Sequence, residues 1–217
     1  MSRDKPRQHK NLILLTGPQG SGNHLWSKIF ALHPEVDGWK DLIYKYWIPS
    51  DKEPFAECWV NPTKAYDLLT HNNVVMNVSV PFVYNGVKQF PQIQAVVDIA
   101  KGKGYNVTVC IVCRDENINR EQQKRVRHEE TLDYAMKYFE HLNADFAYLS
   151  TETLYLHRNN YLKWLSRVLN FPIAYDHSTI KDILKDNQNK KYVKYVDQHW
   201  NDYNVWMGIK PWSEQDG

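Results

Sequence analysis

The sequence of 217 residues has few cysteines, no long apolar run and almost no net charge. Three cysteines are too few, and odd in number, for a disulfide framework, so we expect a reducing, cytoplasmic compartment. Cys110 and Cys113 lie in a strand-like run, where residues three apart point to opposite faces, so we expect no paired metal or redox site there. We also expect no membrane segment and no signal peptide, because no apolar stretch is long enough.

The composition otherwise describes an ordinary globular chain. Hydrophobic residues make up 42% and charged residues 24%, and the formal net charge of +2 does not by itself indicate a nucleic-acid binder. We expect one domain over residues 11–186, preceded by a disordered basic arm over residues 1–10. Residues 187–217 form a polar tail that we expect to dock on the domain through Trp200, Trp206 and Trp212.

The chain is organised around a glycine-rich turn between a predicted strand and a predicted helix. The apolar run at 12–15 precedes the turn, and apolar residues with helical spacing follow it. In such a turn successive backbone N–H groups and the positive end of the helix favour an anionic phosphate. The residues that we expect to bind a nucleotide's phosphates are Gly17, Pro18, Gln19, Gly20, Ser21, Gly22, Asn23 and His24.

The turn lacks the two side chains of the phosphate-loop pattern G-x-x-x-x-G-K-[ST]. Gly17 and Gly22 occupy the glycine positions, but Asn23 replaces the lysine and His24 replaces the hydroxyl residue that binds Mg²⁺. An ordinary glycine turn is the alternative interpretation. The three glycines, the strand and the amphipathic helix together favour phosphate binding.

Strand-like and helix-like segments alternate along the chain, which predicts an α/β fold with a parallel sheet between two layers of helices. Strands are expected at 12–15, 73–79, 105–113 and 146–150, and helices at 25–32, 91–101, 117–127, 131–142 and 161–169. In such a sheet ligands bind beyond the carboxyl ends of the strands. We therefore expect the glycine turn, Arg114-Asp115 and Ser150-Thr151-Glu152 to meet at one edge.

Charged residues near this edge are the catalytic candidates. Arg114 would face a bound phosphate and Asp115 would hold a metal or a hydroxyl proton; the alternative is a structural ion pair. Arg120, Lys124 and Arg127 share one face of the following helix, either as a solvated face or as a lid that neutralises a transferring group. We favour that lid over Lys28 as the replacement for the missing lysine. No residue set predicts a resident metal site.

Residues 42–62 are rich in aromatic side chains and proline, which disfavours a long regular element. The rings either pin a long loop to the body or stack on a planar base or sugar. The aromatic residues are Tyr44, Tyr46, Trp47, Phe55 and Trp59. Asp37, Asp41 and Glu53 flank this region as candidates for a general base, although we expect each to be a solvated carboxylate.

Two families have similar motifs. The glycine turn with Ser21-Gly22, the strand that ends at Arg114-Asp115, and Ser150-Thr151-Glu152-Thr153-Leu154 resemble the sulfotransferases, which bind a sulfated adenine nucleotide (PAPS) in a similar cradle. Gly20 and Gln122 depart from that family's basic residue and serine. Residues 16–30 (TGPQGSGNHLWSKIF), Gly38-Trp39-Lys40, Glu53-Pro54-Phe55-Ala56 and the Arg114-Asp115 strand end resemble more closely the bacteriophage kinases that act on 5-hydroxymethyluracil in DNA.

The second resemblance implies a P-loop NTPase-like fold and an ATP- and Mg²⁺-dependent kinase, located in the host cytoplasm if phage-encoded. Such a kinase phosphorylates the hydroxymethyl group of 5-hydroxymethyluracil, and the phosphate then leaves during thymidine hypermodification. Its partner would be DNA, contacted through basic residues of the arm and tail. Those residues are Arg3, Lys5, Arg7, Lys10, Lys190, Lys191 and Lys194. A PAPS-dependent sulfotransferase and a nucleotide-binding regulator without catalysis are the alternatives.

Overall fold

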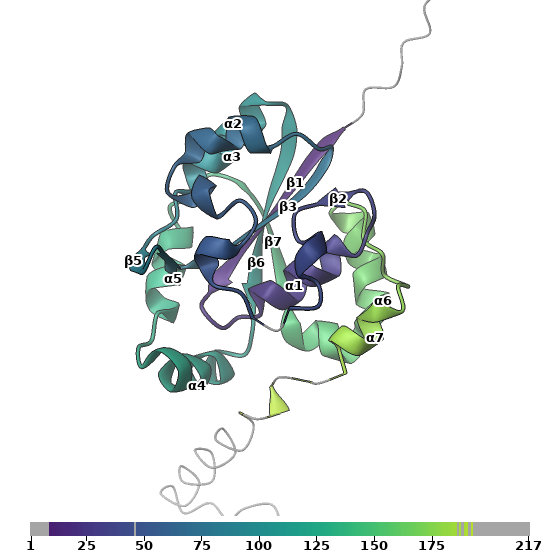
Figure 1. Ribbon diagram of the computed structural model, residues 1–217. Coiled ribbons are helices and arrows are strands. Elements are labelled where there is room, and N and C mark those ends of the chain that lie inside the picture. Colours follow the sequence, from purple (N-terminus) through teal and green to yellow (C-terminus); the bar gives the residue numbers. More distant parts are fainter. Residues whose placement is uncertain (1–8, 46, 186, 188, 191, 193–217) are drawn as a thin grey trace, which may run out of the picture.

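The computed structural model describes residues 9–45, 47–185, 187, 189–190 and 192, except for the side chain of Arg127. A five-stranded sheet forms the centre of the molecule (Figure 1). Its strands, in spatial order, are β2 (Val36–Asp37), β3 (Asn73–Val80), β1 (Lys10–Pro18), β6 (Tyr105–Cys113) and β7 (Asp145–Ser150). Every neighbouring pair is parallel. The α/β fold with a parallel sheet is therefore confirmed.

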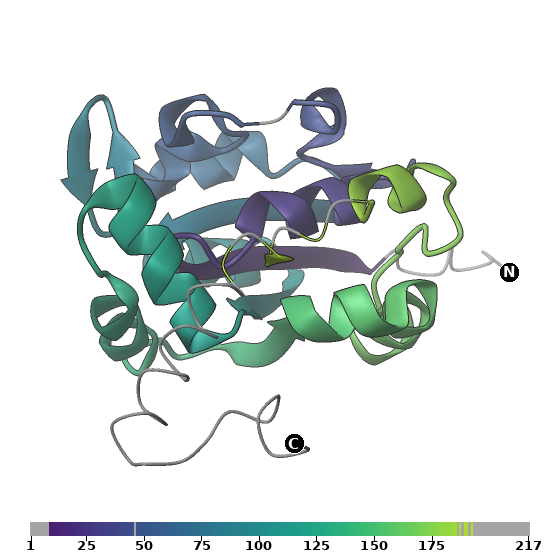
Figure 2. The ribbon, with the colours of Figure 1, turned by 90° about the horizontal axis from the view of Figure 1, so that it is seen from below.

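Helices cover both faces of the sheet, because the inner strands alternate two apolar sets of side chains. In β1, Leu12 and Leu14 pack toward one helix layer, whereas Ile13 and Leu15 pack toward the other. The first layer contains α2 (Ala65–Leu68), α3 (Ile93–Gly102) and α5 (Leu132–Phe139). The second contains α1 (Asn23–Ala31), α6 (Thr151–Val168) and α7 (Thr179–Ile183). Figure 1 shows the two layers on either side of the sheet, and Figure 2 shows β1 running through the middle of the molecule beside α1 (both purple).

The parallel strands bring several chain segments together at the carboxyl edge of the sheet. The glycine turn follows β1, α4 (Glu116–Arg127) follows β6, and α6 follows β7.

Lys10 begins β1, so the predicted disordered arm over 1–10 is wrong at this residue. A nine-residue strand at about 3.3 Å per residue places Lys10 roughly 25 Å from the turn. Lys10 is thus at the opposite edge, and residues 1–8 of the arm lie outside the described residues.

The segment between β2 and β3 is irregular, as its prolines predict. It contains the 3₁₀ turns η1 (Lys40–Leu42), η2 (Ser50–Lys52), η3 (Ala56–Trp59) and η4 (Pro62–Lys64). Trp59 is buried and donates its Nε1–H to the Asn77 carbonyl over 3.1 Å, which pins the segment to β3. Tyr44 and Trp47 are 86% and 61% exposed. The Trp59 ring therefore pins the segment to the body, whereas stacking of the exposed Tyr44 and Trp47 rings on a base or sugar stays a prediction; Tyr46 lies outside the described part.

Two further features differ from the expectations. A hairpin of β4 (Phe82–Tyr84) and β5 (Val87–Gln89) was not predicted, and α6 already begins at Thr151; its backbone is non-helical at Arg158, so the predicted helix from residue 161 is the part after this kink. Of the predicted tail, Trp200, Trp206, Trp212, Lys191 and Lys194 lie outside the described residues. In the described part of the chain, no helix has the length and apolar character needed to cross a membrane.

Candidate functional site

The carbonyl groups of residues 18–22 in the glycine turn accept hydrogen bonds from neighbouring segments, from the turn itself or from α1. The Gln19 oxygen accepts from Asn119 and Gln123, the Gly20 oxygen from Arg114, and the Ser21 oxygen from Thr151. Pro18 accepts from the amide and hydroxyl of Ser21, and Gly22 accepts from the Trp26 amide. The turn is therefore held through its acceptors.

The amide groups of the same turn are less engaged. Among the described residues, the Ser21 amide has a partner, whereas the amides of Gly20, Gly22, Asn23 and His24 have none. Gly20 and Gly22 have φ angles of 85° and 109°, and Gly22 precedes α1 without a side-chain cap. Left-handed residues in a turn, followed by a helix, direct successive N–H groups into one concavity. This arrangement is suited to an oxyanion.

Asn23, which replaces the loop lysine, uses its side chain inside the protein. Asn23 is buried, and its amide group lies 3.0 Å from the Ser21 hydroxyl and 3.0 Å from the Ser79 hydroxyl. A Cβ on Gly17 would meet the Ser21 hydroxyl at 2.5 Å and the Val112 carbonyl at 2.9 Å. The side chains of Ser21 and Asn23 therefore fix the shape of the turn, and of their two backbone amides only that of Asn23 remains for a ligand.

Arg114 is the cation that the structure fastens to the turn. Its Nη1 donates to the Gly20 carbonyl over 2.7 Å and to the Gln122 side chain, and its Nε donates to Asn189 over 2.9 Å. The guanidinium lies 5.4 Å from the Tyr192 ring. Burial lowers the pKa of Arg114, but a guanidinium stays protonated at neutral pH. A fixed positive charge thus borders the turn, as the sequence predicts.

Asp115 makes a structural contact that its sequence position does not predict. Its Oδ1 accepts from the Ile118 amide over 3.0 Å, so Asp115 caps the N-terminus of α4. Its own amide donates to Glu152 Oε1, which also accepts from Asn189. The predicted meeting of the turn, Arg114-Asp115 and Ser150-Thr151-Glu152 at one edge is confirmed. Within the described part, Oδ2 of Asp115 has no hydrogen-bond partner.

The predicted cation row on α4 does not face the turn. The face in contact with the turn carries Asn119, Gln122 and Gln123, and Arg120 and Lys124 lie roughly a third of a revolution away. Arg120 binds the carboxylates of Glu116, Glu130 and Asp133, and Lys124 binds those of Glu121 and Glu130. Hydrogen bonds to these carboxylates raise the pKa of both cations. The side chain of Arg127 lies outside the described part.

A buried pair of titratable groups adjoins the turn. His24 Nε2 lies 2.9 Å from Glu53 Oε1, and Asn77 Nδ2 donates to Glu53 Oε2 over 2.7 Å. The side chain of Glu53 is 6% exposed, and burial raises its pKa despite the opposing hydrogen bonds from His24 and Asn77. The expectation that Glu53 is a solvated carboxylate is therefore wrong. The Trp39 ring lies 5.0 Å from the His24 ring.

Several residues that contact the turn or the His24–Glu53 pair were not predicted from the sequence. Asn77 and Ser79 lie near the carboxyl end of β3, where they interrupt an otherwise apolar strand. Two polar residues at the end of a buried strand were the available signal. Asn119 and Gln123 carried no comparable signal, because polar residues on a basic helix are expected to face solvent.

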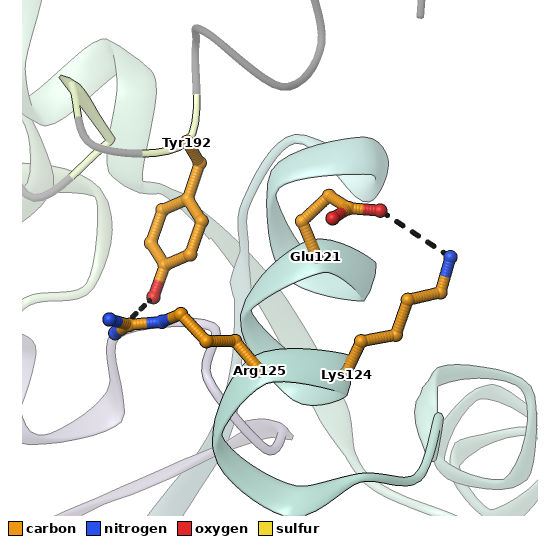
Figure 3. A pocket seen from close by; sticks show the side chains of 4 residues that line it. All are labelled: Glu121, Lys124, Arg125 and Tyr192. Carbon is orange, nitrogen blue, oxygen red and sulfur yellow. Dashed lines mark hydrogen bonds and ion pairs between the residues drawn. The ribbon is translucent and has the colours of Figure 1, made fainter.

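A hollow of about 310 Å³ lies beside α4 (Figure 3). Its lining residues are Glu121, Lys124, Arg125 and Tyr192. Tyr192 accepts a hydrogen bond from Arg125 over 2.9 Å, and its ring also lies near Arg114. The described part of the tail therefore docks at the same edge as the glycine turn.

Among the described residues, no group of three or more His, Cys, Asp or Glu side chains is arranged to hold a metal ion. Cys110 and Cys113 pack in different core clusters, so the prediction that they point to opposite faces is confirmed. Neither the comparison with models of protein families nor that with curated proteins found a match for this chain.

Proposed function

We propose that this protein is an ATP-dependent kinase with a P-loop NTPase-like fold that phosphorylates the hydroxymethyl group of 5-hydroxymethyluracil in DNA. The observation that carries the proposal is the glycine turn after the central strand, with its carbonyls bonded to the body and Arg114 fastened beside it. The amides of Gly20, Gly22, Asn23 and His24 would bind the donor phosphates. Phosphoryl transfer needs mainly positioning and fixed positive charge, which such a turn supplies.

The positions of the sequence blocks that resemble the phage kinases also support the proposal. They are scattered in the sequence, yet Trp39 and Glu53 both contact His24, which follows the glycine turn. Arg114 borders the same turn from the other side. The motifs that carry the resemblance are thus gathered around one site, as shared chemistry requires.

The residues present fit a nucleotide phosphate better than a fully protein-held metal. The unpartnered amides suit phosphate oxygens, and Mg²⁺ commonly needs only one or two carboxylates when phosphates complete its shell. Asp115 Oδ2 is the oxygen that would serve it. Bound with the nucleotide, Mg²⁺ supplies neutralisation of charge on the phosphates.

DNA would reach the site from the irregular segment between β2 and β3. A base in a duplex must be extruded and held by stacking before a kinase can reach it. The exposed rings of Tyr44 and Trp47 belong to the same segment as Glu53, which contacts His24. On this proposal the protein works in the cytoplasm, the host's if phage-encoded.

The sulfotransferase alternative is less well supported by the contacts. A Cβ on Gly20 would lie 3.1–3.4 Å from the Gln122 side chain, and Gln122 also accepts from Arg114. The two departures from the sulfotransferase pattern therefore contact one another and form a single alternative packing. A nucleotide-binding regulator remains the second alternative, because Asn23 supplies no cation.

One labelling experiment distinguishes these functions. The full chain is incubated with γ-labelled ATP and Mg²⁺ and with duplex or single-stranded DNA containing 5-hydroxymethyluracil; the same DNA with thymine is the control. A parallel reaction contains a labelled sulfate donor. Label that enters only the hydroxymethylated DNA from ATP supports the kinase. Label only from the sulfate donor, or nucleotide binding without transfer, overturns it in favour of the sulfotransferase or the regulator.

A further inference from the structure

In His24, ring nitrogen Nε2 contacts a buried carboxylate, whereas Nδ1 has no hydrogen-bond partner among the described residues. Its Nε2 contacts Glu53 Oε1, and the second oxygen of Glu53 is held by Asn77. When Glu53 is ionised, its oxygens only accept hydrogen bonds; Nε2 of a neutral imidazole then carries the proton and the lone pair is on Nδ1. The pair therefore presents an acceptor nitrogen at a defined place.

The surroundings of the pair differ between its two members. Glu53 is almost fully buried, whereas the His24 side chain is 26% exposed and so reaches the surface beside the glycine turn. The Trp39 ring packs against the imidazole at 5.0 Å and restricts its rotation. A relay that activates a nucleophile needs a base and a group that orients the base. His24 would be the base, Glu53 would orient it, and Trp39 would restrict its ring.

We propose that His24 is the general base that removes the proton from the acceptor hydroxyl, and that Glu53 is the positioning residue that orients it. This inference rests on the proposed kinase function. In the step, the hydroxyl proton passes to His24 Nδ1 as the hydroxyl oxygen forms a bond to the γ-phosphorus. The bond from that phosphorus to the β–γ bridging oxygen breaks, ADP leaves with its electron pair, and the imidazolium later releases its proton to water.

The charged groups around the pair are consistent with this role. Lys28 lies one turn further along α1 on the face of His24, but its amine donates to the Lys45 carbonyl, and burial lowers its pKa. Asn77, which donates to Glu53, is neutral. Among the described residues, Glu53 is the charged side chain in contact with His24. The Glu53 carboxylate would stabilise the imidazolium that forms when His24 accepts the proton.

The chain offers a matched control. His71 also pairs with a carboxylate, 3.1 Å from Asp37 Oδ2, but it precedes β3 and so lies at the opposite edge of the sheet. His24→Asn and His71→Asn thus remove the same chemical group from two histidine–carboxylate pairs, of which only the first adjoins the glycine turn. His24→Gln serves as a second variant, and thermal unfolding of each shows that it folds.

The test compares the rate of transfer to hydroxymethylated DNA at about pH 5.5–8.5 with nucleotide affinity measured separately. We expect His24→Asn to lower the maximal rate by about 10²–10⁴-fold and to abolish its rise with pH, with nucleotide affinity nearly unchanged. Glu53→Gln should lower the rate less and change the shape of the pH profile. His71→Asn should behave as the wild type.

Two failures are distinguishable. If the wild-type protein transfers no phosphate to DNA, the proposed function is wrong and the base has no acceptor. If the wild type transfers phosphate and folded His24→Asn and His24→Gln keep its rate and pH profile, only the assignment of the base is overturned. Parallel loss of rate and nucleotide affinity in both variants would make His24 a binding residue and would overturn it as well.

Discussion

The Arg114 guanidinium donates a hydrogen bond to the carbonyl oxygen of Gly20 over 2.7 Å. The cation at the end of the central strand β6 is thereby fixed to the turn that follows the neighbouring strand β1. Gln122 and Asn189 hold the same guanidinium from two other segments. Its charge is therefore positioned before any ligand arrives, so binding an anion beside the turn requires little reorganisation.

We predict that Arg114→Lys weakens nucleotide binding about tenfold and that Arg114→Ala weakens it by up to about a hundredfold. A charge-assisted hydrogen bond contributes about 1.5–3 kcal/mol, and about 1.4 kcal/mol corresponds to a factor of ten in affinity. Lysine keeps the charge but cannot contact Gly20, Gln122 and Asn189 together. Isothermal titration with ATP and Mg²⁺ measures the dissociation constants.

Arg120→Gln is the control for that prediction, since it removes a cation of the same helix region. Arg120 binds Glu116, Glu130 and Asp133 rather than the turn. The nucleotide affinity of the Arg120→Gln variant should therefore stay within about twofold of that of the wild type. If Arg120→Gln lost more nucleotide affinity than Arg114→Ala, the result would contradict the assignment of Arg114 as the nucleotide-binding cation. It would instead support the cation row on α4 that the sequence predicts as a lid.

The pattern of the sequence was sufficient to predict the parallel sheet and the segments that meet at its carboxyl edge. Near-continuous apolar runs predict buried parallel strands, and the carboxyl-end rule then brings Arg114 and Thr151 to the glycine turn. Both contacts are present as hydrogen bonds, to Gly20 and Ser21 respectively. These features depend on local periodicity and on topology, which are readable without knowing how side chains pack.

The relations between side chains could not be read in the same way. Glu53 lies in an irregular segment whose path is set by the docking of Trp59 on β3, so its burial beside His24 depends on tertiary contacts. The cation row on α4 had the expected helical spacing, but spacing alone does not say which face meets the turn. Carboxylates on α4 itself and in the next segment, Glu130 and Asp133 among them, hold Arg120 away from it.

Gly17→Ala should disrupt the turn. A Cβ there would lie 2.5 Å from the Ser21 hydroxyl and 2.9 Å from the Val112 carbonyl, and the latter is backbone that cannot move cheaply. We expect a loss of about 1–3 kcal/mol in the free energy of unfolding and a loss of at least about tenfold in ATP affinity. Urea unfolding and isothermal titration measure the two effects.

Gly102→Ala is the matched control for Gly17→Ala. Gly102 ends α3, and a Cβ there would meet no atom within 4 Å. Alanine is favoured over glycine in helices by about 0.5–1 kcal/mol, so this variant should be as stable as the wild type or slightly more so. Unchanged ATP affinity in a folded Gly17→Ala protein would show that the donor phosphates bind away from the turn.

Asp115 allows its capping role and its proposed metal role to be separated. Asparagine caps helices about as well as aspartate, so Asp115→Asn should keep the stability of the wild type, whereas Asp115→Ala should lose about 0.5–2 kcal/mol. Because Asp115→Asn removes the negative charge, we expect its rate of transfer to fall about tenfold at limiting Mg²⁺ and to recover as Mg²⁺ is raised. An unaffected rate at every Mg²⁺ concentration would leave Asp115 as a helix cap alone.

Glu53→Gln should stabilise the protein increasingly as the pH rises. Burial raises the pKa of Glu53 above its ordinary value of 4.5, so the folded chain holds this proton more tightly than the unfolded chain does. The resulting stabilisation is fully present below that ordinary value and is lost as the pH rises through the higher value of the folded state. Glutamine stays neutral, accepts from Asn77 and donates to the other tautomer of His24, so it avoids this loss. Urea unfolding of both proteins between about pH 4 and 8 measures the difference.

Glu57→Gln is the control for Glu53→Gln. Glu57 lies in the same segment, but its carboxylate is exposed and pairs with Lys64, so the substitution should change the stability little at any pH. A stability difference that shrinks with rising pH would mean that the contact with His24 outweighs the cost of burying the Glu53 charge.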